Sequence, residues 1–96
     1  GISGMDAIRL HKGAEELGEL VRRHPHMAGI LCGHYHRPVF ARWHGVPLLV
    51  AASPAFQLDL RLEAFDGVAV DEPYGMFLHR WTPESGLVTH TEFLPL

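Results

Sequence analysis

Residues 27–32 read MAGILC, a continuous apolar run bounded by Pro25 and Gly33. The shortness of the run and its flanking residues favour a strand buried on both faces over a helix. Residues 11–23 precede it and place apolar side chains at helical spacing, with acidic residues first and basic residues last, as the helix dipole favours. A helix that leads into a buried strand predicts α/β packing.

The rest of the chain predicts mostly antiparallel strands. Apolar segments at 39–43 (VFARW) and 46–52 (VPLLVAA) flank His44-Gly45, a dipeptide suited to a tight hairpin turn. Further strands are predicted at 56–62, 76–81 and 87–94, with turn-forming residues at 66–67, 74–75 and 84–86. The sequence therefore predicts one helix, one buried strand and then a β meander.

The composition excludes several classes of protein. Of the 96 residues 47% are hydrophobic and 20% are charged, and no run approaches the roughly 20 apolar residues of a membrane helix. The formal net charge is −3 and the eight basic residues are scattered, which argues against polymeric nucleic acid as a partner. The single cysteine, Cys32, cannot form an intrachain disulfide and favours a reducing compartment, by default the cytoplasm.

Directly after Cys32, the segment GHYHRP (33–38) contains two histidines one residue apart, His34 and His36. Eight histidines in 96 residues give roughly 0.7 such pairs by chance, so the spacing alone is weak evidence. A second pair, His24 and His26, lies at the end of the predicted helix, where the dipole and solvent favour histidine. His34 and His36 instead follow a predicted strand end, where α/β proteins bind ligands.

The predicted geometry of the second pair suits metal binding. In extended backbone, residues two apart face the same side at about 6.6 Å. Each imidazole could then reach a metal ion at about 2.1 Å, with the two ions about 3.5–4 Å apart. Gly33 would let the backbone pass close beneath the ions, and Arg37-Pro38 would stiffen the exit from the loop. The competing interpretation is a pair of loop histidines hydrogen-bonded to the backbone.

The segment LCGHYHRP (31–38) resembles the Gly-His-x-His motif of calcineurin-like metallophosphoesterases, within the subgroup of class III cyclic-nucleotide phosphodiesterases and glycerophosphodiesterases. Segments 4–10, 24–39, 45–60 and 74–96 also follow the order of that subgroup's C-terminal third. The resemblance implies that residues 1–96 are the C-terminal segment of a single metallophosphoesterase domain, a four-layer αββα sandwich. We therefore expect a chain that begins just past a metal ligand.

The resemblance also implies a function, the hydrolysis of a small phosphodiester, either a cyclic nucleotide or a glycerophosphodiester. Two divalent ions, of manganese, iron, zinc or cobalt, would be the cofactors, with His34 on the second ion and His36 on the first. Neither histidine would be a catalytic base, and backbone carbonyls are expected to hold their other ring nitrogens. The family's other ligand motifs, Asp-x-His, Gly-Asp, Gly-Asn-His and His-His-Pro-Pro, do not occur in this sequence, so the chain alone is expected to be inactive.

Three further residues are candidates for substrate binding. Relatives often have PSTAHQ where this chain has ASPAFQ (52–57), so Phe56 stands where a histidine near the substrate is expected. Its ring could stack on a base or simply pack in the core. Met5 and Asp6, in GMDAI, would border the substrate pocket according to the resemblance; the alternatives are a core position for Met5 and a turn position for Asp6.

Two hypotheses from other classes compete with the phosphodiesterase. A cupin-like barrel also binds one metal through His-x-His, but it expects a glutamate where Phe40 and Ala41 stand. A non-catalytic β module would instead pair exposed sheet edges between chains to form a homo-oligomer. Three other histidines are interpreted as structural or surface residues: His79 as a hydrogen-bonded one, His44 and His90 as turn or surface residues.

Overall fold

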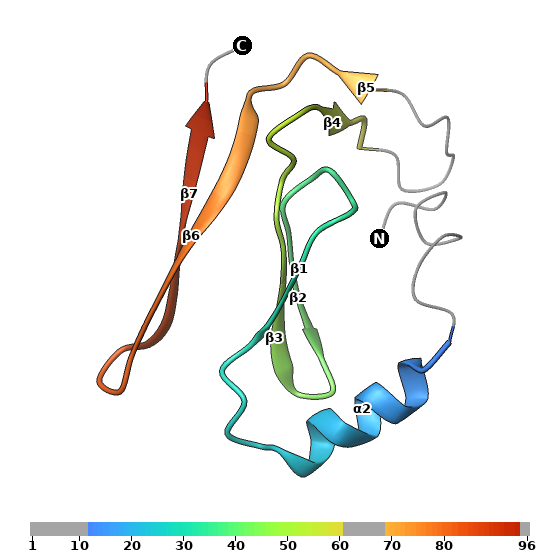
Figure 1. The fold of residues 1–96 in the computed structure, drawn as a ribbon, viewed down its shortest axis with the longest axis vertical. Helices are drawn as coiled ribbons and strands as arrows, with labels where there is room; N and C mark the ends of the chain where they lie inside the picture. Colours follow the sequence, from blue (N-terminus) through green and yellow to red (C-terminus); the bar gives the residue numbers. More distant parts are fainter. Residues whose placement is uncertain (1–11, 61–68, 95–96) are drawn as a thin grey trace.

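The computed structural model describes residues 12–60 and 69–94, which form an α/β arrangement with mostly antiparallel strands (Figure 1). In chain order the elements are α2 (Ala14–Arg23), β1 (Ile30–Cys32), β2 (Val39–Trp43), β3 (Val46–Val50), β4 (Gln57–Leu58), β5 (Ala69–Val70), β6 (Tyr74–Thr82) and β7 (Gly86–Leu94). The α/β class is as predicted, whereas the four-layer sandwich remains a prediction. None of the helices within 12–60 and 69–94 has both the length and the hydropathy needed to span a membrane.

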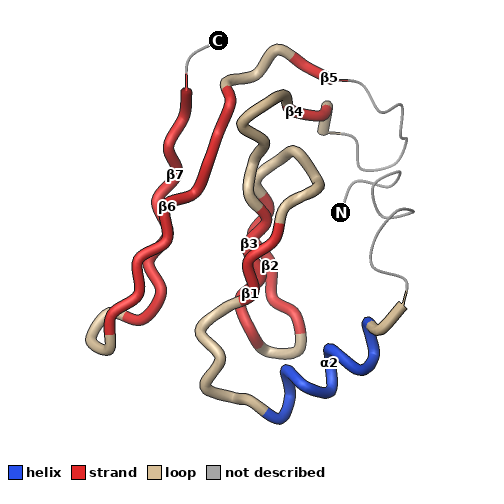
Figure 2. Tube along the Cα trace, viewed as in Figure 1, coloured by secondary structure: helices blue, strands red, loops and turns tan. Residues whose placement is uncertain are grey.

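Helix α2 lies at one end of the three-stranded sheet, near the turn between β2 and β3 (Figure 2). Its first turn is acidic and its last turn is basic, as predicted, and it ends at Arg23, shortly before Pro25. The helix buries Gly18 and Val21, but Leu17 and Leu20 are exposed. The predicted apolar stripe is thus only half covered by the described residues.

Strand β3 is the centre of the three-stranded sheet, in the order β1-β3-β2. Its terminal residues Val46 and Val50 are buried, at 5% and 3% exposure. Strand β1 pairs with β3 in parallel, and β2 pairs with β3 antiparallel, as the predicted hairpin requires. The predicted β meander is not continuous, because β4–β5 and β6–β7 pair in two further sheets. β1 does not pair with β2, the next strand in sequence, because β3 lies between the two strands.

The prediction of a strand buried on both faces at 27–32 is also wrong. The strand is only three residues long, and Leu31 and Cys32 are exposed, Leu31 at 47%. β1 has one hydrogen-bonded neighbour, β3, and therefore lies at the edge of this sheet within the described part of the chain. An edge strand is covered less than a central one. The buried residues of this sheet, Val46 and Val50, are therefore in the central strand, β3.

The turn between β2 and β3 is the tight hairpin that the sequence predicts. His44 and Gly45 have φ values of 49° and 81°, both in the left-handed region. A two-residue turn with positive φ at both positions matches the twist of the flanking strands, and glycine adopts this conformation without steric cost. The pairing of Val39 with Val50 at the other end of the hairpin follows from this register.

Strands β6 and β7 form a long antiparallel hairpin beside the three-stranded sheet (Figure 1). The Phe77 ring stacks on Phe40 of β2, with centroids 5.6 Å apart. Gly75 is buried against residues 52–53, which lead from β3 to β4. The predicted turn at 74–75 is therefore wrong, since these residues begin β6, where a glycine is needed for close approach.

The predicted strand at 56–62 is much shorter in the structure. Only Gln57 and Leu58 form a strand, β4, which pairs with β5. Residues 59–60 are not in a strand, and residues 61–62 lie outside the described residues, as does the predicted turn at 66–67. The alternation of apolar residues there correctly predicted that a strand is present, but not its length.

Candidate metal centre

The histidine pair lies in the loop between β1 and β2, as predicted. The backbone of this loop is not extended: His34 has a φ of 85° and His36 a φ of 58°. The same-side argument at about 6.6 Å spacing is therefore wrong, because it requires extended backbone. Left-handed conformation at a residue other than glycine costs roughly 1–2 kcal/mol, and such positions cluster at functional sites.

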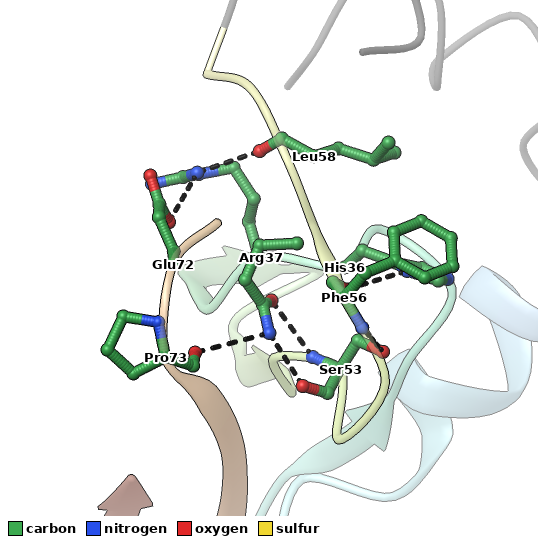
Figure 3. Close-up of polar contacts among 8 residues, drawn as sticks. His36, Arg37, Ser53, Phe56, Leu58, Glu72 and Pro73 are labelled. Carbon is green, nitrogen blue, oxygen red and sulfur yellow. Dashed lines mark hydrogen bonds and ion pairs between the residues drawn. The ribbon is translucent and has the colours of Figure 1, made fainter. Parts of the chain in front are cut away.

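His36 has a defined hydrogen bond. Its Nδ1 lies 3.0 Å from the backbone oxygen of Phe56, and the two rings are in contact, with centroids 4.4 Å apart (Figure 3). A carbonyl oxygen can only accept, so Nδ1–H is the donor, and in the neutral ring Nε2 retains its lone pair. The predicted backbone acceptor is confirmed for His36. His34 is exposed, and among the described residues its ring has no such acceptor.

The Arg37 side chain, next to the histidine pair, fastens the loop to the rest of the fold. Arg37 Nη1 donates to the Leu58 oxygen at 2.7 Å and to Glu72 Oε2 at 2.9 Å. The Leu58 N–H in turn donates to the His36 oxygen at 3.3 Å. We call the contacts of Arg37 with Leu58 and Glu72 the Arg37 clamp. No local pattern in the sequence indicates this ion pair, because Arg37 and Glu72 lie 35 positions apart.

Residues 53–57, here called the Ser53–Gln57 loop, position Phe56. Ser53 Oγ accepts the N–H groups of Ala55 at 3.0 Å and Phe56 at 3.3 Å. Gln57 Oε1 accepts the Ser53 N–H at 3.1 Å, and Gln57 Nε2 donates to the oxygens of Ser53 at 2.6 Å and Pro73 at 3.4 Å. Figure 3 shows Ser53, Phe56 and Pro73 of this network beside His36.

Both end residues of this loop are buried, Ser53 at 8% and Gln57 at 2% exposure. Every buried side-chain nitrogen or oxygen in the described residues has a hydrogen-bond partner. Neither residue was predicted to have a role, although Ser-Pro is a common start of a turn closed by a serine hydroxyl. The partners of Gln57 could not be foreseen, because Pro73 is 16 positions away.

The other candidate residues lie in different parts of the chain. Phe56 is 43% exposed and lies against His36, whereas Met5 and Asp6 lie outside the described residues. His24 and His26 are exposed at the end of α2, as predicted. Three other histidines match their interpretations: His79 Nδ1 lies 2.8 Å from Thr89 Oγ1, His44 is in the hairpin turn, and His90 is exposed.

The donor set suits part of a metal site. Two imidazoles, one with its tautomer set by a carbonyl, are donors that zinc, iron, manganese and cobalt accept. Among residues 12–60 and 69–94 no group of three or more His, Cys, Asp or Glu side chains could hold a metal ion. A complete centre would therefore need ligands from outside the described residues. Gly33 has no positive φ, and the space around its Cβ position is open, so the described residues do not themselves require a glycine there.

A groove of about 630 Å³ lies elsewhere, between α2 and the β2–β3 turn. Arg22 Nη1 lies 2.8 Å from His44 Nδ1 in this groove, and Arg22 Nη2 donates to Glu19 Oε2 at 2.6 Å. The hydrogen bond and positive charge of Arg22 hold the pKa of Glu19 below its ordinary value. The groove lies at the end of β2 opposite the histidine pair, so it is separate from the candidate metal centre.

Comparison with known proteins tests the resemblance. No family model matches the chain. The chain is 41% identical over 96 residues to the probable glycerophosphodiester phosphodiesterase GpdQ of Arcobacter nitrofigilis. The alignment covers 98% of this chain and 35% of that relative, so the chain spans about a third of the relative's length. The predicted resemblance to metallophosphoesterases of the glycerophosphodiesterase subgroup is thereby confirmed along nearly the whole chain.

Proposed function

We propose that this chain supplies His34 and His36 as ligands to a dinuclear metal centre that hydrolyses a phosphodiester. The observation that supports it best is the hydrogen bond from His36 Nδ1 to the Phe56 oxygen, which reserves Nε2 as a metal donor. The left-handed backbone at both histidines adds to this, because strain is retained where function requires it. The remaining ligands would come from outside the described residues.

Divalent ions held there would polarise the phosphoryl oxygens and lower the pKa of the attacking water. In this proposal the residues of this chain hold the ions and orient the loop that carries the two histidines. His36 presents Nε2, the Phe56 carbonyl retains the Nδ1 proton, and the Arg37 clamp fastens the loop to β4. Neither histidine needs to move a proton, which agrees with roles as ligands only.

We favour a glycerophosphodiester over a cyclic nucleotide as substrate, since the relative is named for that activity. The Phe56 ring is exposed and contacts His36, and these observations support a proposed contact with the part of a substrate that lies next to the metal centre. Met5 and Asp6 remain proposed substrate contacts on the resemblance alone. The free thiol of Cys32 supports the cytoplasm as the proposed location.

The test uses the full-length protein and two matched histidine pairs. The double variant His34→Ala/His36→Ala removes the proposed ligands, and His24→Ala/His26→Ala removes an exposed pair of the same spacing. We expect the first to lose at least about tenfold in manganese affinity and in hydrolysis of glycerophosphoethanolamine, and the second to lose neither. Elemental analysis after dialysis measures bound metal, and bis(4-nitrophenyl) phosphate and cyclic AMP compare the substrates.

Two results would contradict the proposal. Unchanged metal content in His34→Ala/His36→Ala would remove the histidines from the centre. Absence of hydrolysis by a metal-loaded wild-type protein would remove the enzymatic assignment.

A homo-oligomeric role is the second candidate, favoured by apolar side chains on the outward face of the β6–β7 hairpin. Met76 and Leu78 are 46% and 61% exposed, and Val88 and Leu94 on the paired strand are 38% and 41% exposed. Sedimentation equilibrium of the wild type and of Leu78→Glu tests it. A monomeric wild type would contradict this role, and a charge at position 78 is expected to dissociate an oligomer that uses this face.

A further inference from the structure

We infer that Ser53 and Gln57 are positioning residues that select the Nδ1–H tautomer of His36 by holding the Phe56 carbonyl in place. The consequence for metal affinity rests on the proposed function, but the tautomer itself can be measured without metal. Ser53 and Gln57 touch neither histidine in this scheme and act only through the Phe56 backbone.

The Phe56 carbonyl is held from both sides. On its N-terminal side, the Phe56 N–H donates to Ser53 Oγ at 3.3 Å. On its C-terminal side, the Gln57 side chain exchanges two hydrogen bonds with the backbone of Ser53, at 3.1 Å and 2.6 Å. Both ends of the carbonyl's chain segment are therefore tied to one residue. The oxygen has little freedom to turn away from His36 Nδ1.

Burial makes this arrangement costly to rearrange. Within the described residues, the buried polar side chains are those of Ser53 and Gln57. A buried amide without partners is strongly disfavoured, so an alternative loop conformation would need equivalent partners for Gln57. The oxygen of Ser53 also accepts the Gly75 N–H at 3.0 Å, which connects the loop to β6. The loop is thus anchored to the start of β6 by the Gly75 N–H and, one residue before that strand, by the Pro73 oxygen.

The choice of tautomer determines whether His36 can bind an ion. A neutral imidazole has one N–H and one lone pair, and the partner of one nitrogen decides which nitrogen keeps the proton. Because a carbonyl only accepts, the Phe56 oxygen favours Nδ1–H and leaves the Nε2 lone pair available. A displaced carbonyl would release this preference, and a proton on Nε2 would compete with the metal.

The test compares variants that remove the positioning contacts with a matched control. Gln57→Glu keeps an acceptor for the Ser53 N–H but loses the donor to the Ser53 oxygen. Ser53→Ala removes the hydroxyl acceptor, and Ser53→Thr restores it. The control is Thr82→Val, because Thr82 Oγ1 accepts the Ser85 N–H at 3.0 Å in a similar local motif within the β6–β7 turn.

The first readout is the tautomer of His36 in the metal-free, full-length protein labelled with ¹⁵N-histidine. Spectra are recorded at about pH 8.5, above the ordinary pKa of free histidine, and a His36→Gln variant assigns the signals. We expect Nδ1–H in the wild type, Ser53→Thr and Thr82→Val, and a shift toward Nε2–H in Gln57→Glu and Ser53→Ala. The signals of His79, whose Nδ1 lies 2.8 Å from Thr89 Oγ1, should stay constant and report that the fold is intact.

The second readout is the dissociation constant for Mn²⁺, which we expect to rise about 10–100-fold in Ser53→Ala and to remain near wild type in Ser53→Thr. Unchanged Nδ1–H in folded Gln57→Glu and Ser53→Ala overturns the inference. If Gln57→Glu loses the His79 signals, the Ser53→Ala and Ser53→Thr pair decides. A tautomer shift in a protein whose wild type binds no Mn²⁺ supports the positioning role and contradicts the proposed function instead.

Discussion

Replacing Gly75 by alanine tests how tightly the β6–β7 hairpin packs against residues 52–53, which lead into the Ser53–Gln57 loop. A Cβ at Gly75 would lie 2.9 Å from the Cβ of Ala52, 0.5 Å inside the 3.4 Å at which ordinary contact begins. Neither methyl group can rotate out of the way, so the backbone of β6 or of residues 52–53 must move. Overpacking of this kind costs about 1–3 kcal/mol, offset by about 0.4–1 kcal/mol from a less flexible unfolded chain. We expect Gly75→Ala to lower the free energy of unfolding by about 1–2 kcal/mol.

Urea denaturation followed by tryptophan fluorescence measures this change, as a midpoint lowered by about 0.5–1 M for a slope near 2 kcal/mol per M. Gly33→Ala is the control, because the space around that Cβ is open and its φ is not positive. The double variant Ala52→Gly/Gly75→Ala removes the clash and should recover about 1 kcal/mol relative to additive single effects. A Gly75→Ala protein as stable as the wild type, or a double variant without this coupling, would refute the steric argument.

Three further predictions concern the turn, the clamp and the helix. Gly45→Ala places a side chain at a φ of 81° and should cost about 1–2 kcal/mol in thermal unfolding; no loss would contradict the assigned hairpin turn. Arg37→Ala removes the Arg37 clamp and should speed amide exchange in β4 and cost about 1–2 kcal/mol, whereas unchanged exchange would mean that the clamp does not hold the loop. Arg22 lowers the pKa of Glu19, so its contribution to stability is present above the ordinary pKa of 4.5 and is lost as the pH falls through the folded value. Glu19→Gln should flatten the acid limb of the stability profile, and an unchanged limb would show that the pair contributes nothing.

The features that the sequence predicted correctly are those that depend on contacts between residues close in sequence. The dipole-matched helix and the hairpin around His44-Gly45 appeared where expected, because periodicity, end charges and turn conformation involve residues close in sequence. The carbonyl partner of His36 followed from the chemistry of imidazole ligands, which need one nitrogen held. The identity of that carbonyl, Phe56, did not follow, because it lies 20 positions away.

By itself, the sequence determined the α/β class, the helix, the hairpin turn and the position of the histidine pair in the loop after β1. Only the tertiary structure decided that β3 inserts between β1 and β2, and that burial belongs to Val46 and Val50 rather than to residues 27–32. It also decided the left-handed backbone of both histidines and the closed Ser53–Gln57 loop behind His36. The physical reason is that strand order and burial depend on which distant segments complete the hydrogen bonds and cover the apolar surface. A local pattern can show that a residue needs a hydrogen-bond partner or a covering side chain. Only the tertiary structure determines which distant residue provides it.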